Sequence, residues 1–447
     1  MRRLQTDDYW SLFNPVQAGS LNDLYSNSFD SAYTEYERNG IASDRMPART
    51  LWNLITDAIR DSSFPFIMFS DNVNARNNQM HIGLVKASSP SAALAQFSST
   101  IDTAVAPSAT LCLTRYIRVD GTLDYDELHR VAKAVVRSLD RTIDVTNYPT
   151  TDAAVSAYRT RSIALGTQGL ADVFSSLEIP FTSDRARALN KRIFETIYHA
   201  ALEGSSELAD SLTPYDAWIG SPAEQGIFQV DMWHADTSEH YNFDALRERI
   251  HRTGLRNSVI TSQMSTTSTA HLFSNSAGVD PYPSNVLRFP ILGCDTTEVV
   301  RPLVNALQKR GLWTDQIRAD ILASDGSVQS ISSIPDDLKV VFLTAYELDQ
   351  HDVISIAADR APFIDQSQSH TLFVPTLTPT LLMDLQLHAW RIGLKTGAYY
   401  VQSNLPTDSL PFIPTNPSPP FSLPPAVQPV SAVSSVNATS VSHAREA

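Results

Sequence analysis

Apolar side chains recur at helical spacing in two long stretches of the chain. Residues 124–140 predict an amphipathic helix with acidic residues in its first turn, and its apolar face carries Leu128, Val131, Val135, Val136 and Leu139. A second helix is predicted to begin after Ser183, a typical N-cap residue, and its apolar stripe carries Leu189, Ile193, Ile197 and Ala201.

Short apolar segments between and beyond these helices are predicted to be strands. They are residues 65–70, 81–86, 226–233, 257–264, 370–375 and 397–403. Helices and strands that alternate along a chain are typical of an α/β protein with a largely parallel sheet. The sequence contains no internal repeat, which excludes a solenoid.

The composition of the chain changes near residue 405. Residues 406–447 are rich in Pro and Ser and have neither helical nor strand periodicity, so they are predicted to form a disordered tail. The predicted organisation is therefore a body, residues 1–405, followed by a tail, residues 406–447.

Charge and cysteine content exclude several classes of protein. A net charge of −14 argues against general binding to nucleic acid or to an anionic membrane. Two cysteines, Cys112 and Cys294, are too few for a disulfide framework or a cysteine zinc site. The N-terminus lacks the apolar region of a signal peptide, and no window resembles a membrane span, so we expect a soluble cytoplasmic protein.

The stretch from Gly83 to Phe97, GLVKASSPSAALAQF, has the form of a strand followed by an active-site loop. Catalytic side chains of α/β enzymes usually lie at such strand ends. Between Ala87 and Ala95, however, there is no carboxylate, thiol, imidazole or amide.

Two other motifs have both a structural and a functional interpretation. The hydroxyl residues of 265–269 suit a helix N-terminus that holds phosphate, but they also suit an ordinary helix cap. Tyr399 and Tyr400 would point to opposite faces of a strand, where core packing is more common than a redox role. The polar run from Asp365 to Ser369 fits either a turn or the rim of a pocket.

The histidines give no indication of a metal site. His234 and His240, like the others, are interpreted as surface or core histidines, because none pairs with carboxylates or cysteines at the spacing of metal ligands. No metal is therefore expected in this chain.

Several longer motifs, in order, resemble the large (catalytic) subunit of eukaryotic-type class I ribonucleotide reductase. They are residues 162–174, 190–203, 220–233, 264–285, 325–339, 360–369 and 393–400. The resemblance extends from about Tyr9 to Leu405. It implies the C-terminal portion of a ten-stranded α/β barrel with a central finger loop, in a family that reduces ribonucleoside diphosphates. The family's ATP cone and first barrel half have no counterpart in this sequence.

The resemblance also implies roles for particular residues. Thr266, Thr267, Ser268 and Thr269 match the loop that holds the substrate phosphates. Tyr399 and Tyr400 match the pair that relays a radical from the small subunit. The family depends on that metal-radical small subunit and on a thioredoxin-like reductant, and no cofactor is expected in this chain.

The residues that perform the family's chemistry are replaced. Ser89, Ser91 and Ala93 stand where the family has an asparagine, the radical cysteine and a glutamate, and Ala106 stands at one reducing cysteine. Reduction needs a thiyl radical, a proton-accepting carboxylate and a dithiol. No catalytic group is retained, so the chain is predicted to be inactive alone.

Two functions remain open for a reductase-like chain without these groups. The first is a binding or regulatory paralogue, or a relic; the second is one half of a split reductase that supplies deoxyribonucleotides. A half barrel exposes sheet edges. We therefore expect either a homo-oligomer or a partner, such as a reductase small subunit or full-length large subunit, and nucleoside diphosphate binding is compatible with both functions.

Overall fold

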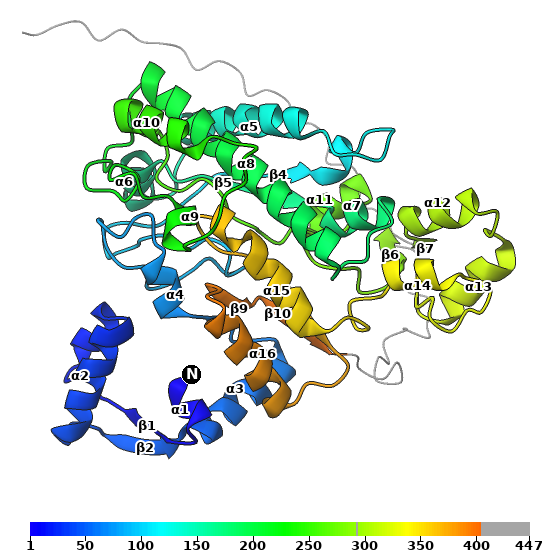
Figure 1. The fold of residues 1–447 in the computed structure, drawn as a ribbon. Helices are drawn as coiled ribbons and strands as arrows, with labels where there is room; N and C mark the ends of the chain where they lie inside the picture. Colours follow the sequence, from blue (N-terminus) through cyan, green and yellow to red (C-terminus); the bar gives the residue numbers. More distant parts are fainter. Residues whose placement is uncertain (292–293, 404–447) are drawn as a thin grey trace, which may run out of the picture. The chain divides into compact units, whose positions relative to one another are not determined.

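Short strands set among many helices make up the described part of the chain, residues 1–291 and 294–403 of this computed structural model (Figure 1). The strands are β1 (Tyr9–Leu12), β2 (Asp44–Pro47), β3 (Ile67–Met68), β4 (Ser108–Cys112), β5 (Ala164–Gln168), β6 (Val286–Ile291), β7 (Cys294–Val299), β8 (Thr371–Val374), β9 (Thr396–Ala398) and β10 (Tyr400–Ser403). The α-helices are α1 (Arg2–Gln5), α2 (Ser26–Arg38), α3 (Ala48–Ser62), α4 (Ser70–Ala75), α5 (Tyr125–Val145), α6 (Thr151–Thr160), α7 (Leu170–Ser176), α8 (Asp184–Ser211), α9 (Gln229–Met232), α10 (Phe243–Thr253), α11 (Thr267–Phe273), α12 (Arg301–Lys309), α13 (Asp315–Ala323), α14 (Asp336–Val341), α15 (Gln350–Arg360) and α16 (Pro379–Arg391). The 3-10 helices are η1 (Gly19–Asp23), η2 (Leu113–Tyr116) and η3 (Ala361–Phe363).

The parallel part of the fold consists of two strand pairs joined by an extended segment. β4 pairs with β5, and β8 pairs with β10, both in parallel. The segment 257–264 lies between the two pairs, because parallel bridges join Leu165 to Thr261 and Gln263 to Gln368. The approach is close: a Cβ added at Gly166 of β5 would lie 2.6 Å from the carbonyl oxygen of Ser262. The predicted parallel arrangement is confirmed here, although 257–264 forms bridges rather than a full strand.

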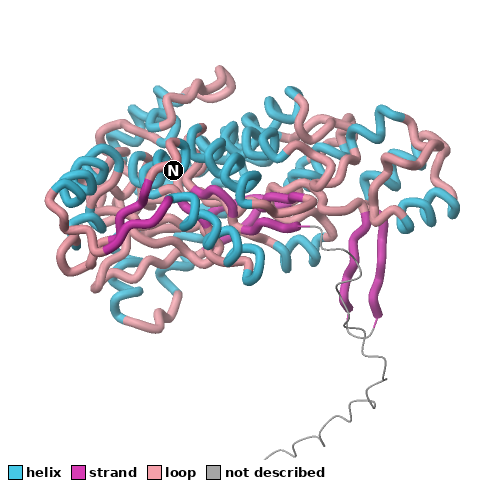
Figure 2. Tube along the Cα trace, turned by 90° about the horizontal axis from the view of Figure 1, so that it is seen from below, coloured by secondary structure: helices cyan, strands magenta, loops and turns pink. Residues whose placement is uncertain are grey.

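Antiparallel pairs flank this parallel part. β1 pairs with β2, β3 with β9, and β6 with β7 as a hairpin, which Figure 2 shows as two adjacent strands. Within the described residues the strands therefore form five two-stranded sheets rather than one continuous sheet.

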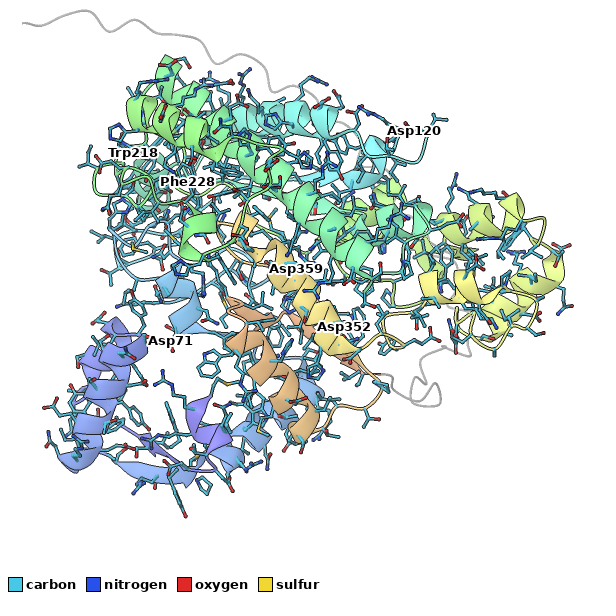
Figure 3. The ribbon with its side chains drawn as sticks, in the orientation of Figure 1. Asp71, Asp120, Trp218, Phe228, Asp352 and Asp359 are labelled. Atoms are coloured by element: carbon cyan, nitrogen blue, oxygen red, sulfur yellow. The ribbon has the colours of Figure 1, made fainter. Side chains whose placement is uncertain are left out.

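Both predicted amphipathic helices are confirmed. α5 begins after Asp124, whose carboxylate accepts a hydrogen bond from the Glu127 N–H at 3.0 Å, and α8 begins after Ser183, whose hydroxyl accepts one from Ala186. The two helices pack side by side (Figure 1). α15 packs against α8 as well, and there Asp359 accepts a hydrogen bond from Arg187 Nε at 2.6 Å (Figure 3).

The predicted strand at 81–86 is wrong. The backbone of this segment forms hydrogen bonds with side chains instead of with a neighbouring strand. The Asn74 side chain accepts a hydrogen bond from the Val85 N–H at 2.8 Å and donates one to the Val85 carbonyl at 3.1 Å. The Asn77 amide donates to the Gly83 carbonyl at 3.0 Å. Apolar alternation cannot reveal such partners, because they depend on the path of the chain around α4.

The predicted strand at 226–233 is also wrong. Residues Gln229–Met232 form the short helix α9, and the Asp231 carboxylate accepts a hydrogen bond from the Phe228 N–H at 2.7 Å. A carboxylate at this position satisfies a free N–H group of a helix start, which a strand would have paired with a neighbour.

Buried apolar residues form two main clusters. One surrounds α5, α8, β4 and β5, and the other lies between α3, α15, α16 and β8. The predicted tail and its boundary at residue 405 fall on residues outside the described ranges. No helix among the described residues is long and apolar enough to cross a membrane.

Candidate functional site

The loop 89–96, called the finger loop below, is held among the parallel segments. The Ala93 carbonyl accepts hydrogen bonds from the Ser367 N–H at 2.9 Å and from the Ser262 hydroxyl at 2.8 Å. The Thr396 hydroxyl donates to the Ala92 carbonyl at 2.7 Å. Three segments far apart in the sequence, 257–264, the residues before β8, and β9, therefore hold the tip of this loop.

The finger loop satisfies its own polar groups with serine. The Ser89 N–H donates to the Leu94 carbonyl at 3.0 Å, and the Leu94 N–H donates to the Ser89 hydroxyl at 3.1 Å. The Ser89 and Ser91 hydroxyl oxygens are 3.2 Å apart. Ala92 and Ala93 are wholly buried, and Ala92 has a φ of +55°, so backbone strain is present at the tip.

A cavity of about 420 Å³ lies beside the finger loop. Ser89, Leu94 and Gln96 line one part of it, and Asp102 and Val105 line another. Four positions were predicted to correspond to the family's reacting groups. Ser89 lines this cavity, whereas Ser91, Ala93 and Ala106 are not part of its wall. The Asp102 carboxylate is paired with Arg159 at 3.2 Å.

The hydroxyl run lies at the start of α11, as predicted. Thr266 is the residue before the helix, and its hydroxyl accepts a hydrogen bond from the Gly278 N–H at 2.7 Å. The Thr269 hydroxyl donates to Gln168 Oε1 at 2.9 Å. Thr267 and Ser268 are exposed, and within the described residues neither their hydroxyls nor their N–H groups have a hydrogen-bond partner. Of the four residues Thr266–Thr269, two thus have structural hydroxyls, and two have no hydrogen-bond partner among the described residues.

Tyr399 and Tyr400 do not point to opposite faces, which corrects the prediction from strand geometry. Their ring centroids are 4.0 Å apart, and the Tyr399 hydroxyl donates to the Tyr400 hydroxyl at 3.0 Å. Tyr399 lies between β9 and β10, and its N–H donates to the His370 carbonyl, so the two residues do not belong to one regular strand. Burial and the Tyr400 hydroxyl raise the pKa of Tyr399 to about 12.

The polar run Asp365–Ser369 is not an exposed turn, because all five residues are buried, and three of them, Gln366, Ser367 and Gln368, line a small pocket. The Asp365 carboxylate accepts hydrogen bonds from the N–H groups of Ile260 and Thr261. Nearby, the buried Lys395 donates to the Asp365 carbonyl at 2.6 Å and to the Arg76 carbonyl at 2.9 Å. Burial lowers the pKa of Lys395 to about 7. The sequence analysis did not identify this lysine. A single charged residue in an otherwise uncharged segment, 393–400, is the feature that could have pointed to it.

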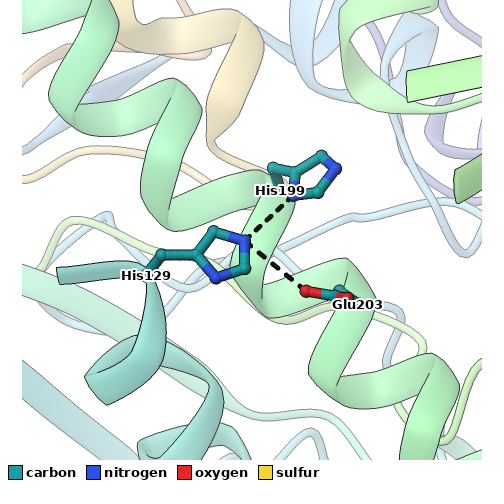
Figure 4. A group of neighbouring side chains, drawn as sticks. All are labelled: His129, His199 and Glu203. Carbon is teal, nitrogen blue, oxygen red and sulfur yellow. Dashed lines mark hydrogen bonds and ion pairs between the residues drawn. The ribbon is translucent and has the colours of Figure 1, made fainter. Parts of the chain in front are cut away.

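Sequence reasoning also missed a group of two histidines and one glutamate. His129 of α5 lies against His199 and Glu203 of α8 (Figure 4). The expectation that no histidine pairs with a carboxylate at metal-ligand spacing is wrong, because His199 and Glu203 are four residues apart on one helix face. His129 could not be added from the sequence, because it comes from a separate helix.

The parallel segments around a buried central loop define this chain as part of an α/β barrel with a finger loop. Residues 1–400 match the family described as "Ribonucleotide reductase, barrel domain", and the chain belongs to this family. The predicted family and fold class are therefore confirmed.

Relatives at sequence level carry the name ribonucleoside-diphosphate reductase large subunit. The Caenorhabditis elegans protein is 37% identical over 412 residues, which are 92% of this chain and 52% of the relative. The Vaccinia virus (strain Copenhagen) protein is 38% identical over 403 residues, covering 90% of this chain and 52% of the relative. The chain thus spans about half the length of the curated relatives it matches.

A solved structure shows the same fold. The Actinobacillus ureae class Id ribonucleotide reductase alpha subunit is similar with a TM-score of 0.65 and 26% identity, over 80% of this chain and 61% of that chain.

Proposed function

We propose that this chain is a ribonucleotide-reductase-like protein without ribonucleoside-diphosphate reductase activity of its own, which acts by binding a nucleotide or a reductase subunit. One observation carries this proposal: at the tip of the finger loop Ser91 and Ala93 stand where the family has its radical cysteine and its glutamate. The backbone of this loop is still held by Ser262, Ser367 and Thr396 of the surrounding segments.

Serine and alanine at these two positions cannot form the radical or accept the proton that the reaction requires. A serine O–H bond is much stronger than a cysteine S–H bond, so Ser91 does not form a usable radical. Ala93 cannot accept a proton, and its side chain is wholly enclosed. Either loss alone costs orders of magnitude in rate.

Cys112 does not replace the missing thiols. Its sulfur lies 2.9 Å from Asn275 Nδ2 and 3.2 Å from Thr114 Oγ1, at the end of β4. A pair of reducing cysteines must bring two sulfur atoms within bonding distance. Cys112 is the one cysteine whose side chain the structure describes, and it is unpaired.

Binding is supported by the parts of the family site that remain. The hydroxyl and N–H groups of Thr267 and Ser268 have no partner among the described residues, so they can donate hydrogen bonds to the oxygens of a diphosphate. The resemblance assigns this role to the corresponding loop of the family. By the resemblance, Tyr399 and Tyr400 match the pair that relays a radical from the small subunit, and in this chain their hydroxyls are 3.0 Å apart. A nucleoside diphosphate and a reductase subunit are therefore the proposed ligands.

Calorimetric titration of the full chain with CDP tests the nucleotide part of this proposal. We expect saturable binding that is weakened at least tenfold in a Thr267→Ala, Ser268→Ala variant. Ser138→Ala, which alters an exposed serine on α5, is the control and should not change the affinity. Absence of saturable CDP binding would leave only the subunit-binding part of the proposal.

A split reductase is the second candidate function, and the Tyr399–Tyr400 contact favours it, because a radical relay has no use without turnover. Its test is reconstitution with the first half of a family barrel and a radical-bearing small subunit. Deoxyribonucleotide formation in that mixture would establish the split enzyme. No product is expected, because a partner cannot supply a thiol or a carboxylate at Ser91 and Ala93.

A further inference from the structure

His129, His199 and Glu203 form a compact group on the helices outside the parallel segments. His199 and Glu203 are one turn apart on α8, and His129 faces them from α5 (Figure 4). His129 Nε2 lies 3.0 Å from His199 Nδ1 and 3.5 Å from Glu203 Oε2. All three side chains are half-buried, so water and ions can reach them.

These distances agree with the requirements of a small divalent ion. Zinc binds imidazole nitrogen and carboxylate oxygen at about 2.0–2.2 Å, which places neighbouring ligand atoms of a tetrahedral site roughly 3.3 Å apart. The two separations from His129 lie on either side of this value, and all three ligand atoms lie within 4.8 Å of one another. Two histidines and one glutamate are also a donor set that zinc uses, with a fourth position left for water.

We propose that His129, His199 and Glu203 bind a divalent transition-metal ion, zinc being the best match, and that the ion fastens α5 to α8. The site lies away from the finger loop and uses none of the residues assigned to nucleotide or subunit binding. It is therefore independent of the proposed function.

One aromatic side chain packs against both histidine rings and limits their movement. Tyr241 stacks on both rings, with centroid distances of 5.6 Å to His129 and 4.7 Å to His199.

Two cations, Lys133 and Arg249, form ion pairs with Glu203 and compete with a metal ion for its carboxylate. Lys133 is 3.1 Å from Glu203, but its shorter contact is with Glu207, at 2.7 Å. Arg249 lies 3.7 Å from both glutamates. Glu207 can keep Lys133 paired when Glu203 turns to a metal ion, so the cost of binding is a weakened ion pair rather than an unpaired lysine.

Titration of the metal-free full chain with zinc chloride tests the proposal, with isothermal calorimetry as the first readout. We expect one site per chain and a loss of affinity of at least about 100-fold in His129→Gln and in His199→Gln, because each removes a direct ligand. The control is His351→Gln, which alters another histidine that contacts carboxylates, Asp349 and Asp384, and should leave the affinity unchanged.

A second readout separates a lost ligand from a lost fold. Bound zinc should raise the thermal unfolding midpoint of the native chain and of His351→Gln, but not that of His129→Gln or His199→Gln. Circular dichroism would establish that the variants are folded. The proposal is overturned if the native chain binds no stoichiometric zinc, if a His129→Gln, His199→Gln double variant still binds it, or if His351→Gln abolishes binding.

Discussion

The Tyr399 hydroxyl donates a hydrogen bond to the Tyr400 hydroxyl at 3.0 Å, although the two residues are adjacent in the sequence. Their rings lie together because β9 ends before Tyr399 and β10 starts at Tyr400. Phe66 packs on both rings, with centroid distances of 4.8 Å and 5.7 Å.

This contact predicts how the pKa of Tyr399 responds to its neighbour. Burial is the larger cause of its rise to about 12, and the Tyr400 hydroxyl is the next. Tyr400→Phe should therefore lower the pKa of Tyr399 part of the way towards the ordinary value of about 10. Proton titration of ring-labelled tyrosine by NMR measures this. Tyr116, whose pKa burial also raises to about 12, is the internal control, and an unchanged Tyr399 titration would contradict the prediction.

The closed packing of the finger-loop tip predicts that a glutamate side chain does not fit at residue 93. The Ala93 side chain is wholly buried and does not line the neighbouring cavity. Ala93→Glu should lower the free energy of unfolding by about 3 kcal/mol or more, because it buries an unpaired carboxylate in a filled space. Urea unfolding measures this, with the exposed Ala87→Glu as the matched control. Equal unfolding midpoints for the two variants would show that the tip is open.

A buried ion pair predicts a large difference between two charge-removing substitutions on α5. Arg161 Nε donates to Asp140 Oδ1 at 2.8 Å, and the two side chains are only 5% and 3% exposed. Asp140→Asn should lower the free energy of unfolding by about 3 kcal/mol, because it leaves the buried guanidinium short of charge compensation. Glu127→Gln, in an exposed pair with Arg130, should leave the unfolding midpoint unchanged. Similar midpoints for both variants would contradict the role of the buried pair.

The buried His370 predicts a loss of stability in mild acid. Burial, with a smaller contribution from Arg360, lowers its pKa from 6.5 to about 4 in the folded chain. The unfolded chain therefore binds more protons between pH 6.5 and 4, and stability falls as the pH drops through that window. From pH 6.5 to 5 this residue alone accounts for about 2 kcal/mol.

His370→Gln should flatten this pH dependence, because glutamine can still donate to the Gly397 carbonyl but does not titrate. Urea unfolding at pH 6.5 and pH 5 measures the difference between variant and native chain. Asp280, whose pKa burial raises to about 6, opposes the effect in both proteins and cancels in the comparison. His240→Gln, an exposed histidine, is the control. Equal pH dependence in the native chain and His370→Gln would rule out this account of acid sensitivity.

Local sequence predicted the two long helices α5 and α8, but not the contacts made across the chain. α5 and α8 were predictable because an apolar stripe and a capping residue lie within each segment. The strand at 81–86 was not, because its backbone is satisfied by the side chains of Asn74 and Asn77. The absence of a thiol or carboxylate at Ser91 and Ala93 is visible in the sequence, whereas the enclosure of Ala93 depends on Ser262 and Ser367, far along the chain.

The reductase assay tests the central claim most directly. The full chain is mixed with a radical-bearing class I small subunit, a dithiol reductant and CDP, and dCDP is measured, with a full-length reductase large subunit as the positive control. The account predicts no dCDP above the level without the chain, while the control forms product. Formation of dCDP that requires the chain and disappears in Tyr400→Phe would contradict it.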